Sequence, residues 1–218
     1  MPGSQERWSG VYLQAHPSSA TTAHVSCLPL SILLSSYLRI TPMITLAGAR
    51  ELIREIPDYP LPGILFQDVT PLLSHGEAFS CVVGALEPLV KDATLIAGIE
   101  ARGFIFAAAL AKSLNLGFIP IRKAGKLPHL TIEESYGLEY GTDVLQIHAD
   151  AFGHGTKVLL LDDVLATGGT VSAATTLISR LGGSLVGAAA VLEISALGGR
   201  GRFQEKHPNI AFDSLFLV

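Results

Sequence analysis

The sequence contains very little cysteine and none of the common motifs for a bound metal or dinucleotide. Its 218 residues include two cysteines, Cys27 and Cys81. These are too few for a disulfide framework, so we expect a reducing, cytoplasmic environment. The seven histidines form no HExxH pair, which disfavours a zinc site built by the protein itself. The GxxxxGK[ST] and GxGxxG motifs are also absent, which excludes a P-loop and the usual dinucleotide fingerprint.

Charge and long apolar runs are scarce as well. Only 16% of the residues are charged and the net charge is -4, so the composition provides no broad basic surface and we expect no nucleic-acid partner. The apolar stretch at 27–38 is too short and too serine-rich to span a bilayer. Arg7 is the one fixed positive charge before it, unlike a signal peptide. We therefore expect no membrane association.

What is present is enough apolar sequence, 49% of the chain, for one domain with a sizeable core. Residues 1–42 are rich in Ser, Thr, Pro and Ala and lack an amphipathic period, so we interpret them as an N-terminal appendage of unknown role. The domain is predicted at 43–218. It begins with a predicted helix over 43–57 that Pro57 ends. The proline-rich segment 58–73 favours a shaped loop over a regular element.

Helices and strands alternate over the remainder. Ser74 to Glu77 has a capping-box pattern that predicts a helix with apolar positions up to Val90. Gly117 is expected to end a later helix. Further strands are predicted at 94–98, 118–122, 157–163 and 184–194, and further helices at 103–115 and 170–183.

The polar, glycine-bearing segment 123–142 has the length of a working lid loop, and an edge or hairpin strand follows it at 143–148. Strands and helices in this order predict an α/β fold with a mostly parallel, doubly wound sheet. In such folds ligands bind at the carboxyl ends of the strands.

Two adjacent acids follow the apolar strand in the stretch VLLLDDVLATGGT, residues 158–170. We interpret residues 162–169 as a crossing turn, with backbone N–H groups of residues 166–170 forming a phosphate cradle at a helix N-terminus. Asp162 and Asp163 are poorly placed for a phosphate but well placed to accept hydrogen bonds from two vicinal hydroxyls of a ribose. The alternative is a solvated acid pair beside an ordinary turn.

The stretch 158–170 closely resembles the signature of the type I phosphoribosyltransferases, which bind 5-phosphoribosyl 1-diphosphate (PRPP). Three more stretches resemble the members of this family that use adenine: YPLPGILFQDVTPLL (59–73), AGIEARGFIF (97–106), and IRKAGKLP (121–128) with SYGLEYG (135–141). Order and spacing agree with the family over about 43–218. The resemblance implies the type I fold, with a small hood at about 57–71 and a flexible lid at about 123–142.

The resemblance also implies a reaction and its partners. The expected reaction converts adenine and PRPP to AMP and pyrophosphate in purine salvage. Mg²⁺ would be held mainly through PRPP, with no metal site made by the protein alone. A homodimer is expected. Two alternatives stay open: a regulator that binds PRPP or nucleotides without turnover, and an enzyme that acts on a 6-oxopurine.

Carried over to matching positions, the resemblance implies a role for each site residue. Glu139 is the candidate catalytic group, as an acid-base residue or as an electrostatic stabiliser of an oxocarbenium-like sugar. Ribose and 5′-phosphate would bind Asp162, Asp163, Ala166, Thr167, Gly168, Gly169 and Thr170. Pyrophosphate would bind Glu100, Ala101, Arg102, Arg122, Lys123, Lys126 and Tyr140, with a cis peptide between Glu100 and Ala101. Adenine would contact Leu65, Phe66, Gln67 and Ile194.

Three features qualify these assignments. Gln67 stands where the family generally has Arg or Lys, so a main-chain role survives but a charge contributed to PRPP does not. Ala101 replaces a serine of some relatives, which removes a hydroxyl. Without the flanking motifs, Phe66 and Ile194 would be interpreted as core packing, and Arg102 as a solvent-facing residue of a helix-capping turn.

Overall fold

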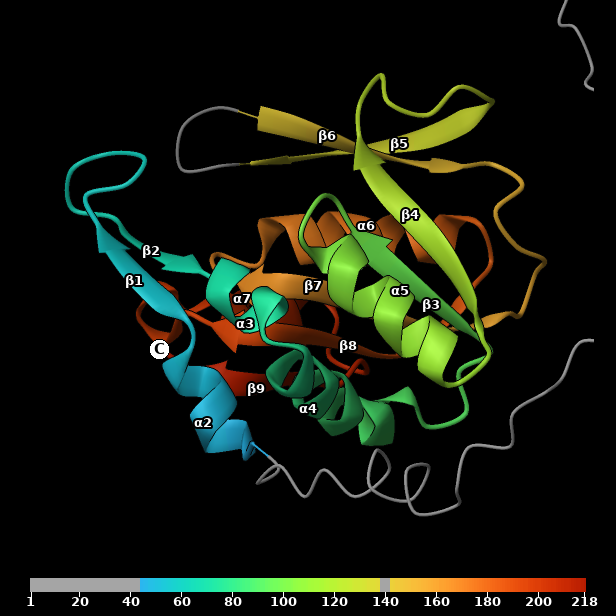
Figure 1. Ribbon diagram of the computed structural model, residues 1–218. Coiled ribbons are helices and arrows are strands. Elements are labelled where there is room, and N and C mark those ends of the chain that lie inside the picture. The colour runs from blue at the N-terminus through green and yellow to red at the C-terminus, as the bar shows by residue number, and fades with distance from the viewer. Residues whose placement is uncertain (1–43, 138–141) are drawn as a thin grey trace, which may run out of the picture. The chain divides into compact units, whose positions relative to one another are not determined.

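A seven-stranded sheet forms the centre of the computed structural model, which describes residues 44–137 and 142–218 (Figure 1). The strand order is β5-β6-β4-β3-β7-β8-β9. The strands are β3 (Leu95–Ile99), β4 (Gly117–Lys123), β5 (Thr131–Gly137), β6 (Thr142–His148), β7 (Lys157–Leu165), β8 (Ser184–Glu193) and β9 (Phe212–Leu217). The five strands β4-β3-β7-β8-β9 are parallel to their neighbours. The β5–β6 hairpin is antiparallel, and β6 pairs with β4 in antiparallel orientation. The predicted mostly parallel α/β sheet is confirmed.

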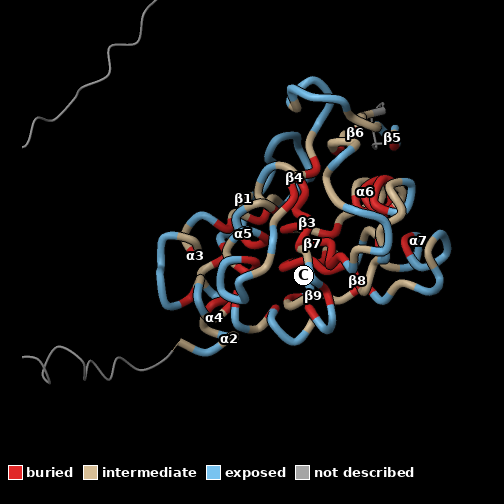
Figure 2. The backbone as a smooth tube through the Cα atoms, turned by 90° about the vertical axis from the view of Figure 1, so that its right-hand side faces the viewer, coloured by how far each residue is buried: buried red, intermediate tan, exposed pale blue. Residues whose placement is uncertain are grey.

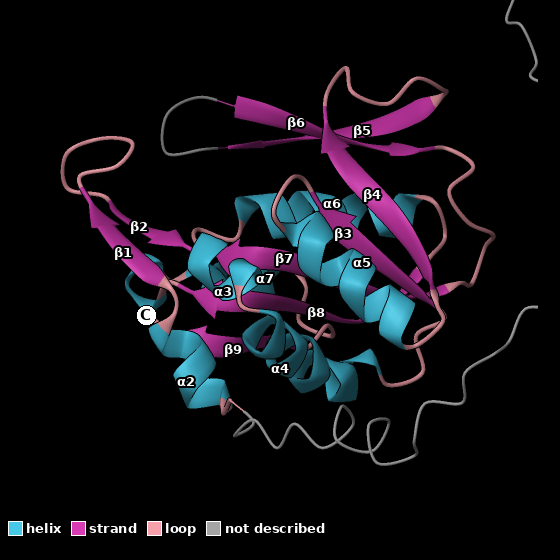
Figure 3. Ribbon diagram, in the orientation of Figure 1, coloured by secondary structure: helices cyan, strands magenta, loops and turns pink. Residues whose placement is uncertain are grey.

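Helices cover both faces of this sheet (Figure 3). On one face α4 (Gly76–Leu86) and α5 (Gly103–Ser113) pack over a core that includes Leu159 and Leu161 of β7. On the other face α6 (Gly169–Arg180) and α7 (Gly199–Lys206) pack over a second core, which includes Val158 and Leu160. Successive β7 residues thus enter opposite cores, as strand geometry requires. In Figure 2 the buried residues, drawn in red, are concentrated in central strands such as β3 and β7 and in α6.

The segment before residue 70 contains a shorter helix than predicted and a strand pair that the sequence did not predict. A short helix α2 (Leu46–Glu51) is followed by an antiparallel pair, β1 (Arg54–Pro57) and β2 (Leu65–Asp68). The helix predicted over 43–57 is therefore wrong beyond Glu51, because Ile56 pairs with Phe66 across the two strands. Pairing between distant segments outweighs the local helical period.

The loop predicted over 58–73 is also wrong in its second half. After β2, the chain forms α3 (Thr70–Ser74), with Pro71 in its first turn, where a missing N–H costs no helical hydrogen bond. The predicted capping box is wrong too, since the ring of His75 caps α4 by accepting a hydrogen bond from the N–H of Ala78 at 3.2 Å. A 3₁₀ turn, Glu87–Val90, follows α4.

Most of the other predicted elements are confirmed within one or two residues, but their ends differ. Asn115, at φ 55°, lies in the turn after α5, while Gly117, the predicted terminator, already belongs to β4. The segment predicted as a polar lid loop contains β5, paired along its length with β6, so a loop is wrong for 131–137. The predicted hairpin strand at 143–148 is confirmed as β6.

Strand β7 extends two residues beyond the strand predicted at 157–163 and takes up the first half of the crossing turn predicted over 162–169, which shrinks to residues 166–168. The 3₁₀ turn Ser195–Leu197, α7 and β9 had not been predicted. Helix α7 has the sequence GRGRFQEK, which lacks an apolar face and buries only Gly199 and Phe203. Within the described residues, every helix is too short or too polar to cross a membrane.

Candidate active site

The acid pair of β7 lies inside the protein. Asp162 is 8% exposed and Asp163 is 6% exposed. Oδ1 of Asp162 accepts a hydrogen bond from the N–H of Asp163 at 2.9 Å. Nε of Arg102 lies 2.7 Å from Oδ2 of Asp163, but this ion pair is not aligned as a hydrogen bond, and Oδ2 has no hydrogen-bond partner among the described residues. The acid pair is therefore short of donors.

Burial and mutual repulsion shift both carboxyl groups. Burial raises the pKa of Asp162 well above its usual value, and the charge of Asp163 raises it further. Burial also raises the pKa of Asp163, although the nearby Arg102 guanidinium opposes this change. The ionised pair is thus destabilised in the free protein. Hydrogen-bond donors or a cation supplied by a ligand would stabilise it.

The turn after the acid pair has the geometry of an anion site. Gly168 has φ +84°, a left-handed conformation that favours glycine, and a Cβ there would lie 2.7 Å from the carbonyl oxygen of Gly199. The N–H groups of Thr167 and Gly168 donate no hydrogen bond to any described residue. Together with the N-terminus of α6 they can bind an anion. Asp162 and the turn line one cavity of about 50 Å³, which also includes Thr170.

A second strand-to-helix junction, residues 98–103, lies against the acid pair. The peptide between Glu100 and Ala101 is cis, as the family resemblance implied. A Cβ on Gly103 would lie 2.9 Å from Oδ1 of Asp162, so only glycine lets α5 begin this close to β7. The two junctions named from the sequence are therefore neighbours in space.

Arg102 connects the acid pair to the hood. While its Nε faces Asp163, its Nη1 donates a hydrogen bond to the carbonyl oxygen of Gln67 at 3.3 Å. Its guanidinium also lies 5.0 Å from the ring centre of Phe66, in cation–π contact. The ring of Tyr59 packs edge-on against Phe66 at 5.1 Å. The predicted adenine-binding loop and the predicted pyrophosphate-binding arginine are thus in direct contact.

Two of the predicted pyrophosphate-binding cations, Arg122 and Lys126, share one carboxylate. Glu100 accepts hydrogen bonds from Lys126 Nζ at 2.6 Å and from Arg122 Nη2 at 3.2 Å. Burial raises the pKa of Glu100, but the hydrogen bonds from Lys126 and Arg122 outweigh burial and lower it to about 2. Lys123 instead pairs with Asp143 of β6 at 2.8 Å, a partner that no sequence pattern indicated.

The predicted adenine contacts lie in two places. Gln67 is only 5% exposed, and its Oε1 has no hydrogen-bond partner among the described residues, whereas Leu65 is 47% exposed. On the other side, the N–H of Ile194 donates to the carbonyl of Leu165 at 2.9 Å, directly before the anion-binding turn. Phe66 is therefore joined to the acid pair through Arg102, and Ile194 is joined to the turn through Leu165.

Glu139 and Tyr140, the candidate catalytic residue and its neighbour, lie outside the described residues. The strands on either side are described, with Gly137 of β5 opposite Thr142 of β6. A Cβ on Gly169 would lie 3.0 Å from the carbonyl oxygen of Gly137, so the end of β5 rests against the start of α6.

The carboxylates of the acid pair could provide only some of the ligands that Mg²⁺ requires. Carboxylate oxygens are suitable ligands for this cation. However, the described residues contain no group of three or more His, Cys, Asp or Glu side chains that could hold a metal. Asp162 and Asp163 could supply at most part of a coordination shell, and the remaining oxygens would have to come from a substrate and water.

The fold is that of a PRPP-dependent transferase of type I, and acids, a turn with the geometry of an anion site and a cluster of cations meet at the carboxyl edge of its mostly parallel sheet. The family model described as "Phosphoribosyl transferase domain" matches residues 84–212. An adenine phosphoribosyltransferase of Thermobifida fusca is 57% identical over 150 residues, which cover 68% of this chain and 85% of that protein.

Solved structures agree with the sequence comparison. The adenine phosphoribosyltransferase of Thermoanaerobacter pseudethanolicus superimposes with a TM-score of 0.75 at 43% identity, covering 80% of this chain and 100% of that one. The enzyme of Giardia lamblia, solved with 9-deazaadenine, gives a TM-score of 0.75 at 36% identity and covers 80% and 98% of the two chains. The chain belongs to the adenine phosphoribosyltransferases, which are pentosyltransferases of purine salvage.

Proposed function

We propose that the acid pair, the turn after β7 and the cation cluster bind PRPP, and that the chain transfers its phosphoribosyl group to adenine. N9 of adenine would form a bond to C1′ of the ribose, and the bond from C1′ to the pyrophosphate oxygen would break. Adenine loses its N9 proton, and the products are AMP and pyrophosphate. The observation that carries the proposal is the buried acid pair, which is short of hydrogen-bond donors and of which Asp162 lines one cavity together with the turn.

Each part of PRPP is matched by a different group. The two ribose hydroxyls would donate hydrogen bonds to Asp162 and Asp163, which lowers the cost of keeping these buried acids ionised. The 5′-phosphate would accept hydrogen bonds from the N–H groups of residues 166–170 and from the hydroxyls of Thr167 and Thr170. Two neighbouring subsites of opposite preference, one for donors and one for an anion, are what a phosphorylated sugar requires.

Pyrophosphate binding would require the cations to change partners. Arg122 and Lys126 are paired with Glu100 in the structure, and Arg102 with Asp163 and Gln67. Moving toward pyrophosphate, Arg102 would release the Gln67 carbonyl and the face of Phe66. Cations placed where the leaving group gains charge stabilise the transition state. Ala101 and Tyr140, with Lys123, complete the proposed pyrophosphate contacts.

Mg²⁺ is proposed to accompany PRPP. Bound to pyrophosphate and ribose oxygens, the ion would neutralise charge on the leaving group. The chain's own contribution would be limited to a carboxylate oxygen of Asp162 or Asp163.

Adenine would bind between the hood and the residue after β8. Phe66 offers a ring for stacking and Ile194 an apolar wall, while main-chain groups of Leu65 and Gln67 would read the amino group and the adjacent ring nitrogen. A backbone acceptor for the adenine amino group is left unpaired by a 6-oxopurine, which disfavours the wrong base. Glu139 is proposed to manage the purine proton or to stabilise the cationic sugar, with Tyr140 contacting PRPP.

A panel of free bases with PRPP and Mg²⁺ tests this function. Adenine should give AMP, and hypoxanthine, guanine and xanthine should give far less product. Higher turnover on a 6-oxopurine would reassign the base, and PRPP binding without any product would identify a regulator. Glu139→Ala should lower turnover by about a hundredfold or more, whereas near-normal turnover would remove Glu139 from the mechanism. We also propose that the protein is cytoplasmic and that it forms a homodimer. Sedimentation analysis can test the homodimer.

A further inference from the structure

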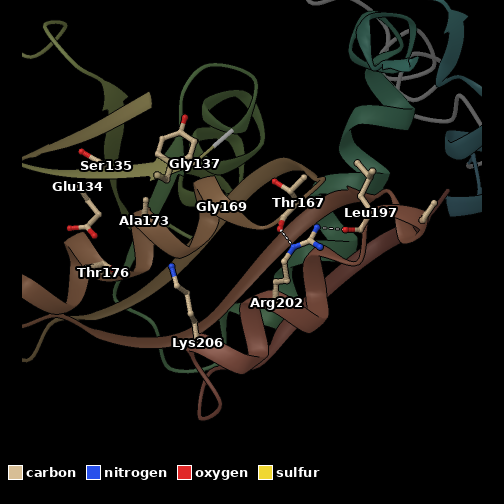
Figure 4. A pocket seen from close by; sticks show the side chains of 12 residues that line it. Glu134, Ser135, Gly137, Thr167, Gly169, Ala173, Thr176, Leu197, Arg202 and Lys206 are labelled. Carbon is tan, nitrogen blue, oxygen red and sulfur yellow. Dashed lines mark hydrogen bonds between the residues drawn. The ribbon is translucent and has the colours of Figure 1, made fainter. Parts of the chain in front are cut away.

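Helix α7 lies directly behind the anion-binding turn, on the side of its carbonyl groups. Nε of Arg202 donates a hydrogen bond to the carbonyl oxygen of Thr167 at 2.9 Å. Its Nη2 donates to the carbonyl oxygen of Leu197, so the guanidinium bridges the turn and the segment before α7 (Figure 4). A Cβ on Gly199 would overlap the carbonyl oxygen of Ala166. Two successive carbonyls of the turn therefore point at α7.

This orientation determines where the N–H groups of the turn point. In a trans peptide the C=O and N–H of one peptide unit point in opposite directions. Within the described residues, cis peptides occur only at Tyr59–Pro60 and Glu100–Ala101, so the peptides of the turn are trans. With the carbonyls of Ala166 and Thr167 facing α7, the N–H groups of Thr167 and Gly168 must face the other way, away from α7.

The helix itself is firmly anchored to the sheet. Arg200 of α7 donates hydrogen bonds from Nε to both carboxylate oxygens of Glu193 at 3.1 Å, and from Nη2 to Ser214 Oγ at 2.7 Å. Ser214 Oγ in turn donates to Glu193 Oε2 at 2.6 Å. Glu193 is opposite Leu165 in the β7–β8 ladder, one residue before the turn. The position of α7 is thus fixed relative to the start of the turn.

We propose that α7 is a rigid backing for the phosphate-binding turn and that Arg202 is a positioning residue for PRPP. Arg202 acts through the main chain: by holding the Thr167 carbonyl it keeps the N–H of Gly168 directed at the 5′-phosphate. The inference rests on the proposed function, since it takes residues 166–170 as the phosphate site. No predicted site residue belongs to α7, so the proposal gives this helix a role that the sequence did not indicate.

Arg202→Met tests the proposal, with Lys206→Met as the matched control. Both substitutions remove one positive charge from α7 beside the same cavity of about 680 Å³. Of the two side chains, only Arg202 donates a hydrogen bond to the turn among the described residues. Arg202→Met should raise the KM for PRPP about tenfold, as expected for the loss of a hydrogen bond from a charged donor. The KM for adenine should not change, and Lys206→Met should leave both KM values unchanged.

Two further variants separate positioning from general damage. Arg202→Lys keeps one charged donor and should recover part of the PRPP affinity. Gly199→Ala should weaken PRPP more than Arg202→Met, because its Cβ would displace the Ala166 carbonyl. Thermal melting of each variant reports whether the fold is intact. An unchanged KM for PRPP in Arg202→Met, or equal increases for both substrates, would overturn the proposal.

Calorimetric titration with ribose 5-phosphate distinguishes this inference from the proposed function. The wild-type protein should bind ribose 5-phosphate, and Arg202→Met should bind it about tenfold more weakly. Equal binding by both proteins rejects the positioning role and leaves the transferase function standing. If the wild-type protein turns over adenine and PRPP but residues 166–170 bind no phosphate, the positioning role fails alone. If it neither binds ribose 5-phosphate nor makes AMP, both proposals fail.

Discussion

Glu193 and the Asp162–Asp163 pair are buried carboxylates at the carboxyl ends of neighbouring parallel strands, but their surroundings are opposite. Glu193 accepts hydrogen bonds from Arg200 and Ser214. Asp162 and Asp163 have one imperfectly aligned cation, Arg102, and an oxygen without a partner among the described residues. Hydrogen bonds from Arg200 lower the pKa of Glu193, whereas burial raises the pKa of both aspartates.

The difference separates an acid whose charge is compensated within the fold from two acids whose charge the described residues compensate poorly. Buried charges are normally paired and hydrogen-bonded, because an unpaired one is costly. Glu193 obeys this rule within the chain. Asp162 and Asp163 do not obey it among the described residues, and under the proposed function the hydroxyl donors or a cation of the substrate would complete their pairing. Carboxyl groups perturbed in this way are concentrated at functional sites.

The largest expected change in stability comes from breaking the Glu193 cluster, which is Glu193 with its hydrogen-bond donors Arg200 and Ser214. Arg200→Met leaves Glu193 buried without its cation, and this should lower the free energy of unfolding by about 3 to 5 kcal/mol. Chemical denaturation measures the change. Arg202→Met is the control in the same helix; its side chain is exposed, so the loss should be below about 1 kcal/mol. Similar losses in both variants would contradict a special role for the Glu193 cluster.

Replacing a carboxylate by an amide should change the free energy of unfolding in opposite directions at the two sites. Glu193→Gln removes charge-assisted hydrogen bonds and should lower the free energy of unfolding by about 2 kcal/mol. Asp162→Asn removes a destabilised charge and keeps an oxygen for the N–H of Asp163, so it should raise the free energy of unfolding by about 1 kcal/mol. Denaturation curves at neutral pH give both values. Destabilisation by Asp162→Asn would show that the acid pair is structural.

The pH dependence of stability should also differ in sign. The pKa of Glu193 is lowered in the folded state, so its contribution is present above its ordinary value of 4.5 and is lost as the pH falls through the folded pKa. The pKa of Asp162 is raised above 3.8, so the folded state is disfavoured as the pH rises from 3.8 through the folded pKa. The stability gained by Asp162→Asn should therefore grow over that rise. A gain independent of pH would contradict the shifted pKa.

The smallest change in stability and activity is expected from removing residues 1–42. The Glu193 cluster and the acid pair both make their described contacts within 44–218. Truncation before Met43 should therefore leave melting temperature and turnover of adenine largely intact. Failure of the truncated chain to fold would show that the segment is part of the core or of a dimer interface.

The sequence predicted the centre of the fold well because local pattern and tertiary environment agree there. Strands β3, β7 and β8 are built around apolar runs, and the buried sheet is where such runs belong. The acid pair and the turn after it are predicted as a site because acids and glycines between an apolar strand and a helix have few structural explanations, and the structure places them at neighbouring positions at the carboxyl edge of the sheet.

Prediction was poorer wherever structure depends on distant pairing. Ile56 and Phe66 are partners across β1 and β2, which no local period indicates. Residues 131–137 are polar enough for a loop but form a strand because β6 completes their backbone hydrogen bonds. Helix α7 buries only Gly199 and Phe203. Its Arg202 contacts the turn across 35 positions of sequence, a contact that only the fold reveals.

Calorimetric titration with PRPP and Mg²⁺ tests most directly whether the buried acid pair is a ribose site. The wild-type protein is compared with a double variant that carries Asp162→Asn and Asp163→Asn, and pyrophosphate, which has no ribose, serves as the second ligand. The Kd for PRPP should rise by about a hundredfold or more when two charge-assisted hydrogen bonds are lost, while binding of pyrophosphate should not weaken. Equal affinity of both proteins for PRPP would contradict the assignment.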